Sequence, residues 1–361
     1  MQTKIIATTE EFYKLKDDWE RLQEQDTDTT YYSTFEYNWT WWDVYHQDND
    51  KKLFIICVYN NDKIVGIAPL IIETKPKKVF KYNVLKFMGA GDYLNVLVDK
   101  KEKNELTIIK DIFNEIEKMN EKYERIQLTH IKHNSMFASY LLKSKIYNAN
   151  FKYLIECPIL RIRNFEDYDD YKKKFITSSA NKYKNRLKRE VDYDFFVINN
   201  KSIDVYERIS DLHIKEQEFL TNERNRQDRY SLFNDKLRGD FTRKIYKNNS
   251  NVITFLLETK NKELIIYDTC YSYKGILHSW NMAFNPIYEK YNVGRIINYE
   301  IFKYIFENNF AYVFDFGAGR YPWKFEWTND FIFDYQLDMW NEKTKKGRLL
   351  KKIYKIKERV K

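Results

Sequence analysis

The feature that most constrains the fold is a pair of apolar segments that occurs once in each half of the chain. Residues 54–72 and residues 253–269 each read as an apolar strand, a short polar turn and a second apolar strand. Segments with helical spacing of apolar residues flank both pairs. A chain of 361 residues is also too long for one small core. The sequence therefore predicts two similar α/β domains, divided near residues 150–158.

Apolar periodicity and turn residues locate the expected elements. In the first half, helices are expected over 10–25, 36–47 and 102–122, and strands within 52–73, 84–98 and 125–131. In the second half, helices are expected over 165–175, 179–191, 202–220 and 295–308, and strands at 194–198, within 251–284 and at 311–316. Asn60-Asn61-Asp62 predicts a hairpin turn. Thr8 or Thr9 is expected to cap the first helix, because a hydroxyl accepts an unpaired amide hydrogen bond.

Composition excludes several classes of protein. The chain has 30 Tyr, 25 Phe and 8 Trp, which excludes a disordered chain, and its 9 Gly and 5 Pro leave no long flexible linker. Its three cysteines are far apart in sequence and do not suggest a disulfide framework. The first residues lack the pattern of a signal peptide, and the apolar runs are too short for a membrane helix. We expect a cytoplasmic protein, with peripheral contact at the inner membrane face as an option.

The positive charge is concentrated near the C-terminus. The net charge is +9, and residues 342–361 hold ten Lys or Arg and two Glu, so the rest of the chain is close to neutral. Within this tail Leu349, Ile353, Ile356 and Val360 have helical spacing. Three interpretations remain open, in this order: a helix packed on the domain, a helix on an anionic membrane surface, and a contact with RNA phosphates.

A second basic segment, residues 171–190, has eight Lys or Arg and one Glu. Its apolar residues fall on one helical stripe, so a solvated amphipathic helix is the simple interpretation. Guidance of an anionic acceptor is the functional one.

The most distinctive motif is DFGAGRYPWK at residues 315–324. It follows a strand-like run and predicts a glycine-rich turn in which the backbone can approach a ligand closely. Two cations and two aromatic residues follow the glycines, namely Arg320, Tyr321, Trp323 and Lys324. Such a turn is suited to an anionic or sugar-like ligand, and a tight turn beside an ordinary core is the alternative.

The histidines offer one candidate general base. His213 lies on an expected helix with Glu216 three residues later, so the two share a helical face. Glu218 is also within one turn. His278 lies on a central-looking strand and reads as a core histidine. The remaining histidines and the scattered cysteines do not form a convincing zinc pattern, so no metal is expected.

The placed segments resemble a known family, the cellulose-biosynthesis-type (CelD-like) acetyltransferases of the GNAT superfamily, which are related to FemAB-type ligases. The motifs that carry the resemblance are YYSTFEYNWTWW (31–42), IVGIAPLII (64–72), FMGAGDYLNVLV (87–98), CPILRI (157–162), RLKRE (186–190), NPIYEKYNVGR (285–295) and DFGAGRYPWK (315–324). The resemblance implies an α/β (α+β) fold of two tandem GNAT-like domains, each a mixed, mostly antiparallel sheet flanked by helices. The domains would cover residues 1–155 and 156–341, followed by a basic amphipathic helix over 342–361.

The resemblance also implies an activity, the transfer of an acyl group from acetyl-CoA or another acyl-CoA. The acceptor would be an amino sugar or a nucleotide- or lipid-linked sugar of the cell envelope. In the loop that would meet the donor pyrophosphate, Gly294 and Arg295 are in place, but the usual second glycine or alanine is absent. In the last motif Trp323 replaces the family's tyrosine. An indole does not pass protons as a phenol does, so Tyr321 is the nearest substitute.

These considerations predict the following roles. The expected catalytic residues are His213, Asp315, Tyr321 and Lys324; the donor would meet Gly294, Arg295 and Arg320; and the acceptor would meet Asp92, Tyr93, Trp323 and Gly319. Two other functions remain open. One is a FemAB-like ligase that takes its acyl group from an aminoacyl-tRNA, and the other is a non-catalytic scaffold in polysaccharide assembly.

Overall fold

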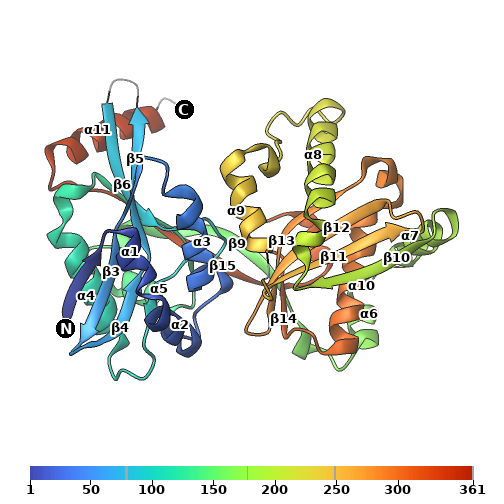
Figure 1. Cartoon of the computed structure of the whole chain (residues 1–361), viewed down its shortest axis with the longest axis horizontal. Coiled ribbons are helices and arrows are strands. Elements are labelled where there is room, and N and C mark those ends of the chain that lie inside the picture. Colours follow the sequence, from blue (N-terminus) through green and yellow to red (C-terminus); the bar gives the residue numbers. More distant parts are fainter. Residues whose placement is uncertain (78–79, 177, 248, 360–361) are drawn as a thin grey trace. The chain divides into compact units, whose positions relative to one another are not determined.

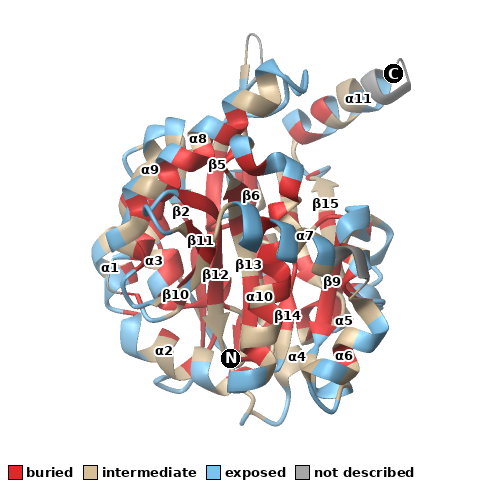
Figure 2. Ribbon diagram, turned by 90° about the vertical axis from the view of Figure 1, so that its right-hand side faces the viewer, coloured by how far each residue is buried: buried red, intermediate tan, exposed pale blue. Residues whose placement is uncertain are grey.

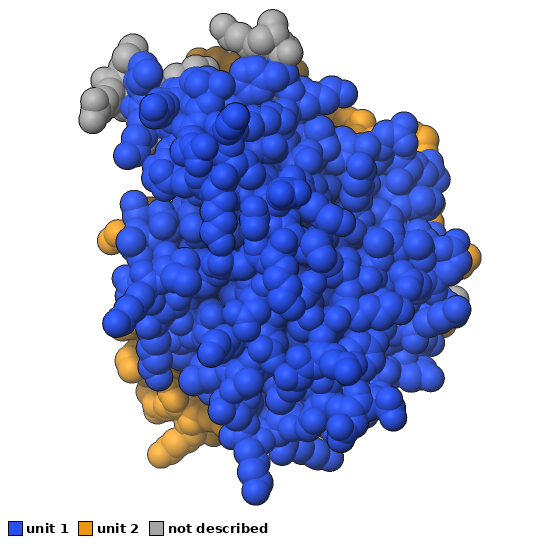
Figure 3. Space-filling view, turned by 90° about the vertical axis from the view of Figure 1, so that its left-hand side faces the viewer, with its two compact units in different colours: residues 1–156, 332–361 blue, residues 157–331 orange. Residues whose placement is uncertain are grey.

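The chain divides into two compact units in the computed structural model, which describes residues 1–77, 80–176, 178–247 and 249–359. Unit 1 comprises Met1–Glu156 and Ile332–Lys361, and unit 2 comprises Cys157–Phe331 (Figure 3). The chain enters unit 2 within strand β9 (Phe151–Arg161) and returns to unit 1 within strand β15 (Asp330–Trp340). The expected second domain, 156–341, therefore differs from unit 2 at its C-terminal end.

Unit 1 is a mixed α/β unit with two groups of strands. Its elements are β1 (Gln2–Ile6), α1 (Thr9–Tyr13), α2 (Lys16–Gln25), α3 (Phe35–Tyr45), β2 (Lys51–Leu53), β3 (Ile55–Asn60), β4 (Lys63–Ala68), β5 (Leu70–Lys77), β6 (Phe80–Phe87), β7 (Leu97–Val98), α4 (Glu105–Lys118), β8 (Arg125–Lys132), α5 (Met136–Lys143) and α11 (Lys345–Arg359). Strands β1, β3, β4 and β7 form an antiparallel sheet. The hairpin between β3 and β4 turns at Asn61, whose φ is 53°, which confirms the predicted hairpin.

The second group of strands in unit 1 explains why the C-terminal segment belongs there. Strand β6 pairs with β5 and, in parallel, with β8, and β2 pairs with β5. Strand β15 pairs antiparallel with β8, from Asp334 opposite Lys132 to Trp340 opposite Arg125. This pairing joins residues about two hundred positions apart, which local patterns do not reveal.

The first predicted helix is interrupted. Residues 9–25 form α1 and α2 rather than one helix, and the Leu15 N–H bonds the Phe12 carbonyl, three residues back. This tighter turn lets Phe12 and Trp19 both lie fully buried. The Thr8 hydroxyl accepts the Glu11 N–H at 3.2 Å, so Thr8 is the cap.

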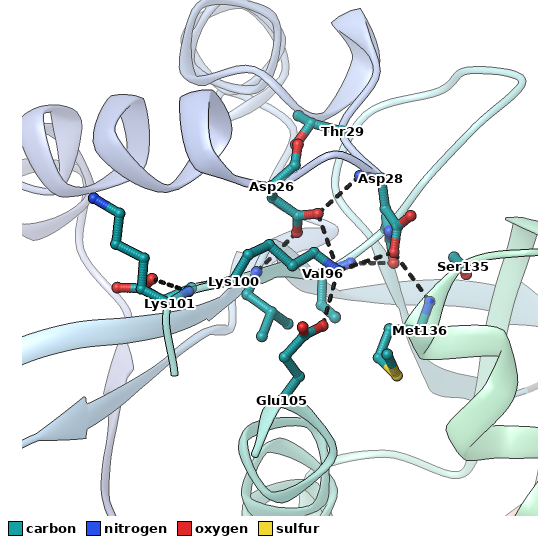
Figure 4. Close-up of polar contacts among 12 residues, drawn as sticks. Asp26, Asp28, Thr29, Val96, Lys100, Lys101, Glu105, Ser135 and Met136 are labelled. Atoms are coloured by element: carbon teal, nitrogen blue, oxygen red, sulfur yellow. Dashed lines mark hydrogen bonds and ion pairs between the residues drawn. The ribbon is translucent and has the colours of Figure 1, made fainter. Parts of the chain in front are cut away.

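An ionic cluster around the buried Asp26 carboxylate joins several elements of unit 1 (Figure 4). Lys100 Nζ lies 2.9 Å from Glu105 Oε2, 3.3 Å from Asp28 Oδ2 and 3.5 Å from Asp26 Oδ1. Asp26 also accepts the backbone N–H groups of Asp28 and Val98. Burial raises the pKa of Asp26, and the Lys100 charge opposes that shift. The cluster thereby joins the segment after α2 to β7 and to the start of α4.

We predict that Lys100→Met destabilises the protein by about 2 kcal/mol, because a buried carboxylate loses its cation. Urea unfolding followed by circular dichroism measures the change. Lys101→Met is the matched control, because Lys101 is the next residue and is exposed. An equal loss in both variants would show that the cluster contributes nothing specific.

Unit 2 contains one group of strands with helices on both faces. Its elements, besides β9, are α6 (Tyr168–Phe175), α7 (Ser178–Glu190), β10 (Tyr193–Asn199), α8 (Tyr206–Asn222), α9 (Lys236–Tyr246), β11 (Val252–Thr259), β12 (Leu264–Tyr273), β13 (Ile276–Phe284), α10 (Val293–Asn308) and β14 (Val313–Asp315). The strand order is β10-β11-β12-β13-β14-β9. Strands β13 and β14 run parallel, and the other neighbours run antiparallel.

Side chains alternate across the sheet of unit 2 and separate two helical layers. Phe255 and Leu257 of β11 join the core that includes residues of α6, α7 and α10. Thr254, the residue before Phe255, points to the opposite face, where it bonds the Ser202 hydroxyl at 3.1 Å. Helices α8 and α9 cover that face (Figure 1). The strands are largely buried and the outer helix surfaces are exposed (Figure 2). Within the described residues, no helix has the length and apolar composition needed to cross a bilayer.

Candidate functional site

A cavity of about 450 Å³ lies in unit 2 at the N-terminal end of α10. Its walls come from α8, from the end of β13, from the first turn of α10 and from the segment after β14. The lining residues are Glu216, Met282, Phe284, Glu289, Asn292, Val293, Gly294, Arg295, Asn298, Trp323, Glu326 and Trp327. Aromatic and aliphatic side chains form part of this wall, and polar or charged side chains, three glutamates among them, form the rest.

The N-terminal end of α10 lines this cavity. The first N–H groups of a helix have no partner within the helix. The N-cap residue, Asn292, is left-handed with φ 55° and ψ 49°, and among the described residues no side chain caps this end. At Gly294 nothing lies within 4 Å of the place a Cβ would take, so the backbone is open to a ligand. Because a helix N-terminus carries partial positive charge, this wall favours an anionic group.

Arg295 adds a cation to the same wall, and it pairs with Glu326, which also lines the cavity. Glu289 on the rim pairs in turn with Arg224 at 2.5 Å. Of the residues expected to meet the donor, the structure therefore brings Gly294 and Arg295 together at one cavity. Arg320 is exposed and does not belong to its lining.

Glu216 places a carboxyl group in the cavity wall. Its side chain is buried, Oε1 accepts the Phe284 N–H at 3.1 Å, and Oε2 accepts the Gln217 side-chain amide at 2.9 Å. Burial raises the pKa of Glu216 to about 7, although both hydrogen bonds oppose the shift. A carboxyl group that titrates near neutral pH can take a proton from an attacking amine.

In the sequence pattern Glu216 appears only as a partner of His213, and the structure shows it as a further candidate base. The available signal was a carboxylate on the buried stripe of a helix, where Leu212, His213 and Gln217 are its buried neighbours. Charged residues are seldom buried without a specific reason.

His213 occupies a different environment. Its Nδ1 lies 2.9 Å from the Ser231 hydroxyl, and its ring contacts the Phe233 ring at 5.4 Å between centroids. Burial lowers the pKa of His213 to about 4, so the imidazole is neutral at physiological pH. The residue is not part of the cavity lining.

Asp315 and Lys324, which the sequence predicts to be catalytic, both contact backbone groups of the glycine-rich turn after β14. Asp315 accepts the Gly317 N–H at 2.8 Å and lies 3.4 Å from His278 Nδ1. Lys324 is only 4% exposed and donates to the carbonyls of Gly317 and Ala318 at 2.8 and 3.0 Å. Both contacts satisfy backbone groups of the turn, which is a structural role.

The two aromatic residues of this turn differ in their relation to the cavity. Trp323 lines the cavity and Tyr321 does not, although both rings lie near the Lys324 ammonium, at 5.9 and 5.3 Å from centroid to Nζ. Tyr321 is 51% exposed. Gly319 has a φ of 116°, which disfavours any residue with a Cβ, and it serves the turn. Trp327, which the sequence did not single out, is the second aromatic wall.

Asp92 and Tyr93, expected at the acceptor, belong to unit 1 and follow a turn at Gly89–Gly91. Tyr93 is buried and Asp92 is partly exposed. Gly89 has a φ of 81°, and the Tyr37 hydroxyl bonds the Ala90 carbonyl of this turn. The glycine conformation and this hydrogen bond are structural reasons for the turn.

No group of three or more potential metal ligands occurs in the described part of the chain.

Comparison with known families identifies the region that contains the cavity. Residues 178–325 match the model of an acetyltransferase (GNAT) domain. The part of the chain that is similar to a GNAT-type domain therefore lies within unit 2. The matched range includes all residues of the cavity except Glu326 and Trp327. No curated protein matches the sequence.

Solved structures extend the likeness to nearly the whole chain. The structure of FemX covers 93% of this chain and 97% of its own, with a TM-score of 0.59 and 13% identity. L-PGS from Bacillus licheniformis covers 92% and 94%, with a TM-score of 0.52 and 13% identity. A tandem GNAT protein from the clavulanic acid biosynthesis pathway covers 93% and 98%, with a TM-score of 0.50 and 8% identity.

At these identities the likeness concerns the fold. It confirms the predicted fold of two tandem GNAT-like domains with mixed, mostly antiparallel sheets. The matches show a GNAT-like fold and do not single out the CelD-like branch, which stays a prediction.

We predict that Glu216→Gln flattens the pH dependence of stability. The pKa of Glu216 rises from 4.5 to about 7 on folding, so the folded state holds the proton more tightly. The resulting stabilisation is complete below pH 4.5 and is lost as the pH rises to about 7, and it amounts to ~3 kcal/mol.

The free energy of unfolding is measured at several pH values between about 4 and 8, a range that includes the titration of Glu216 in both the unfolded and the folded state. Glu218→Gln is the matched control, because Glu218 lies on the same helix and is exposed. Asp268, whose pKa burial also raises to about 7, contributes equally to all variants, so only differences count. Parallel curves for the wild type and Glu216→Gln would contradict the burial of this carboxyl group.

Proposed function

We propose that this protein is a GNAT-type acyltransferase that uses an acyl-CoA, such as acetyl-CoA, to acylate the amine of an amino sugar or a related cell-envelope precursor. The observation that carries the proposal is the cavity that joins the open N-terminus of α10 to the Glu216 carboxyl group. The same cavity is lined by a helix N-terminus, which suits an anion, and by a carboxyl group that can accept a proton.

The donor fits the features of the cavity wall. The pyrophosphate of CoA would meet the first N–H groups of α10, where Gly294 permits close approach. Arg295 would exchange its ion pair with Glu326 for one with the pyrophosphate. The thioester arm would then lie along the apolar side chains Met282 and Phe284.

Glu216 would act as the general base. Its carboxylate takes the proton that the amine must lose before the amine nitrogen attacks the thioester carbonyl. The carbon–nitrogen bond forms, the carbon–sulfur bond breaks, and the thiolate leaves and takes up a proton. Trp323 and Trp327 would provide flat apolar surfaces for the acceptor. The choice of an amino sugar rests on the resemblance of the sequence motifs.

A second candidate is a ligase that uses an aminoacyl-tRNA. Likeness in fold to FemX and L-PGS favours it, as does the basic segment over α6 and α7. Part of that basic charge is already paired, because Lys184 contacts Glu300 at 2.9 Å and Arg186 contacts Glu190 at 3.2 Å. This candidate predicts strong, salt-sensitive tRNA binding and no CoA binding.

We predict that Gly294→Asp weakens acetyl-CoA binding at least about tenfold, whereas Gly294→Ala changes it little. The aspartate adds negative charge where the pyrophosphate would bind. It does not harm the helix, because an acidic residue in the first turn is favourable. Calorimetry with acetyl-CoA measures both, and tRNA titrated at two salt concentrations tests the ligase. Failure of wild-type protein to bind acetyl-CoA, with tight binding of tRNA, would replace the first proposal by the second.

We predict that Glu216→Gln lowers kcat/KM by about 10²–10⁴, whereas His213→Asn retains activity within about tenfold. Release of free CoA thiol with glucosamine as the acceptor provides the assay. For the wild type, kcat/KM should rise with pH and level off above about 7, because the carboxylate form of Glu216 is required. A rise centred near pH 4 together with an inactive His213→Asn would instead return the role of base to His213.

A further inference from the structure

The described side chains of helix α11 that pack on unit 1 lie on one face of the helix. Leu350 is fully buried against Tyr82 and Val84. One turn later the Tyr354 hydroxyl lies 3.0 Å from that of Tyr82, and its ring contacts the Trp340 ring at 4.9 Å between centroids. The packing expected for the basic tail is therefore present. Among the described side chains of α11, it involves the side of the helix that carries Leu350 and Tyr354.

The outer face of α11 carries exposed apolar side chains. Leu349 is 56% exposed and Ile356 is 63% exposed. The two residues are seven positions apart, so they lie on the same side of the helix two turns from each other. Ile353, between them, is partly buried. The fourth apolar residue predicted for this helix, Val360, lies outside the described residues.

Basic residues surround these two side chains. Lys345 lies one turn before Leu349, and Lys352 lies between Leu349 and Ile356 on the same face. In the described part of the chain, Lys345, Lys352 and Lys355 form no ion pair with a carboxylate. Basic residues nearer the body are engaged, since Lys346 contacts Glu124 at 3.4 Å and Lys351 contacts Glu342.

We propose that this outer face of α11 binds the surface of an anionic lipid bilayer. Leu349 and Ile356 would enter the boundary between headgroups and acyl chains, and Lys345, Lys352 and Lys355 would remain near the lipid phosphates. The charge of this segment favours an anionic lipid surface as the partner, because residues 342–361 carry a net charge of +8. An RNA contact would use the lysines but gives no role to exposed apolar side chains. The proposal is independent of the chemistry in unit 2.

Cosedimentation of the full chain with vesicles tests the proposal. The vesicles contain phosphatidylcholine alone or phosphatidylcholine with phosphatidylglycerol. One variant removes the apolar contacts, Leu349→Ser with Ile356→Ser, and another removes charge, Lys345→Gln, Lys352→Gln and Lys355→Gln together. We expect binding only to the anionic vesicles, and a loss of about tenfold or more in partitioning for each variant.

Matched controls carry the same chemical changes elsewhere in unit 1. Leu142→Ser with Ile146→Ser alters two exposed apolar residues, and Lys52→Gln, Lys103→Gln and Lys110→Gln remove three exposed lysines. Both controls should bind vesicles within about twofold of the wild type. All altered side chains of α11 are at least partly exposed, so circular dichroism should show an intact fold. Truncation is avoided, because Leu350 and Tyr354 pack on the body.

Three results would overturn the proposal. The first is equal binding to neutral and anionic vesicles, or no binding to either. The second is wild-type binding by the variant that lacks Leu349 and Ile356, with loss only in the charge variant; competition by tRNA would then identify a polyanion site. The third is an equal loss in the lysine control, which would show an effect of total charge rather than of α11.

Discussion

The parallel pairing of β13 with β14 is the constraint on which the candidate site depends. Parallel neighbours cannot be joined by a hairpin, so the chain must cross over, and α10 is that crossover. The helix therefore begins beyond the carboxyl end of β13, where its first N–H groups are available. The segment after β14 starts at the same edge of the sheet and supplies Trp323 and Trp327. Ligands in α/β folds commonly bind at this edge.

Features confined to consecutive elements could be predicted from the sequence. Gly294 and Arg295 stand at the start of a helical pattern, and the family resemblance placed them at the donor. The glycine turn follows a short strand, and local reasoning placed it at a ligand site. The same reasoning failed to show which way side chains point. Lys324 reads as an exposed cation in the motif, yet it turns inward to two carbonyls of its own turn.

Long-range packing decided what the sequence left open. His213 and Glu216 are both on the buried side of α8, and only the rotation of that helix against β13 determines which one reaches the cavity. Similarly, the return of the chain to unit 1 depends on the pairing of β15 with β8, for which no local pattern exists.

The hydrogen bond from the Phe284 N–H to Glu216 has a consequence for any attempt to engineer this protein. One carboxyl group fastens α8 to the end of β13 and also sits where a proton would be accepted. Under the proposed mechanism, a neutral replacement would avoid the cost of burying a charge but would also remove the proton acceptor. Selection for heat tolerance alone would then favour replacements at this position that lack the proposed base.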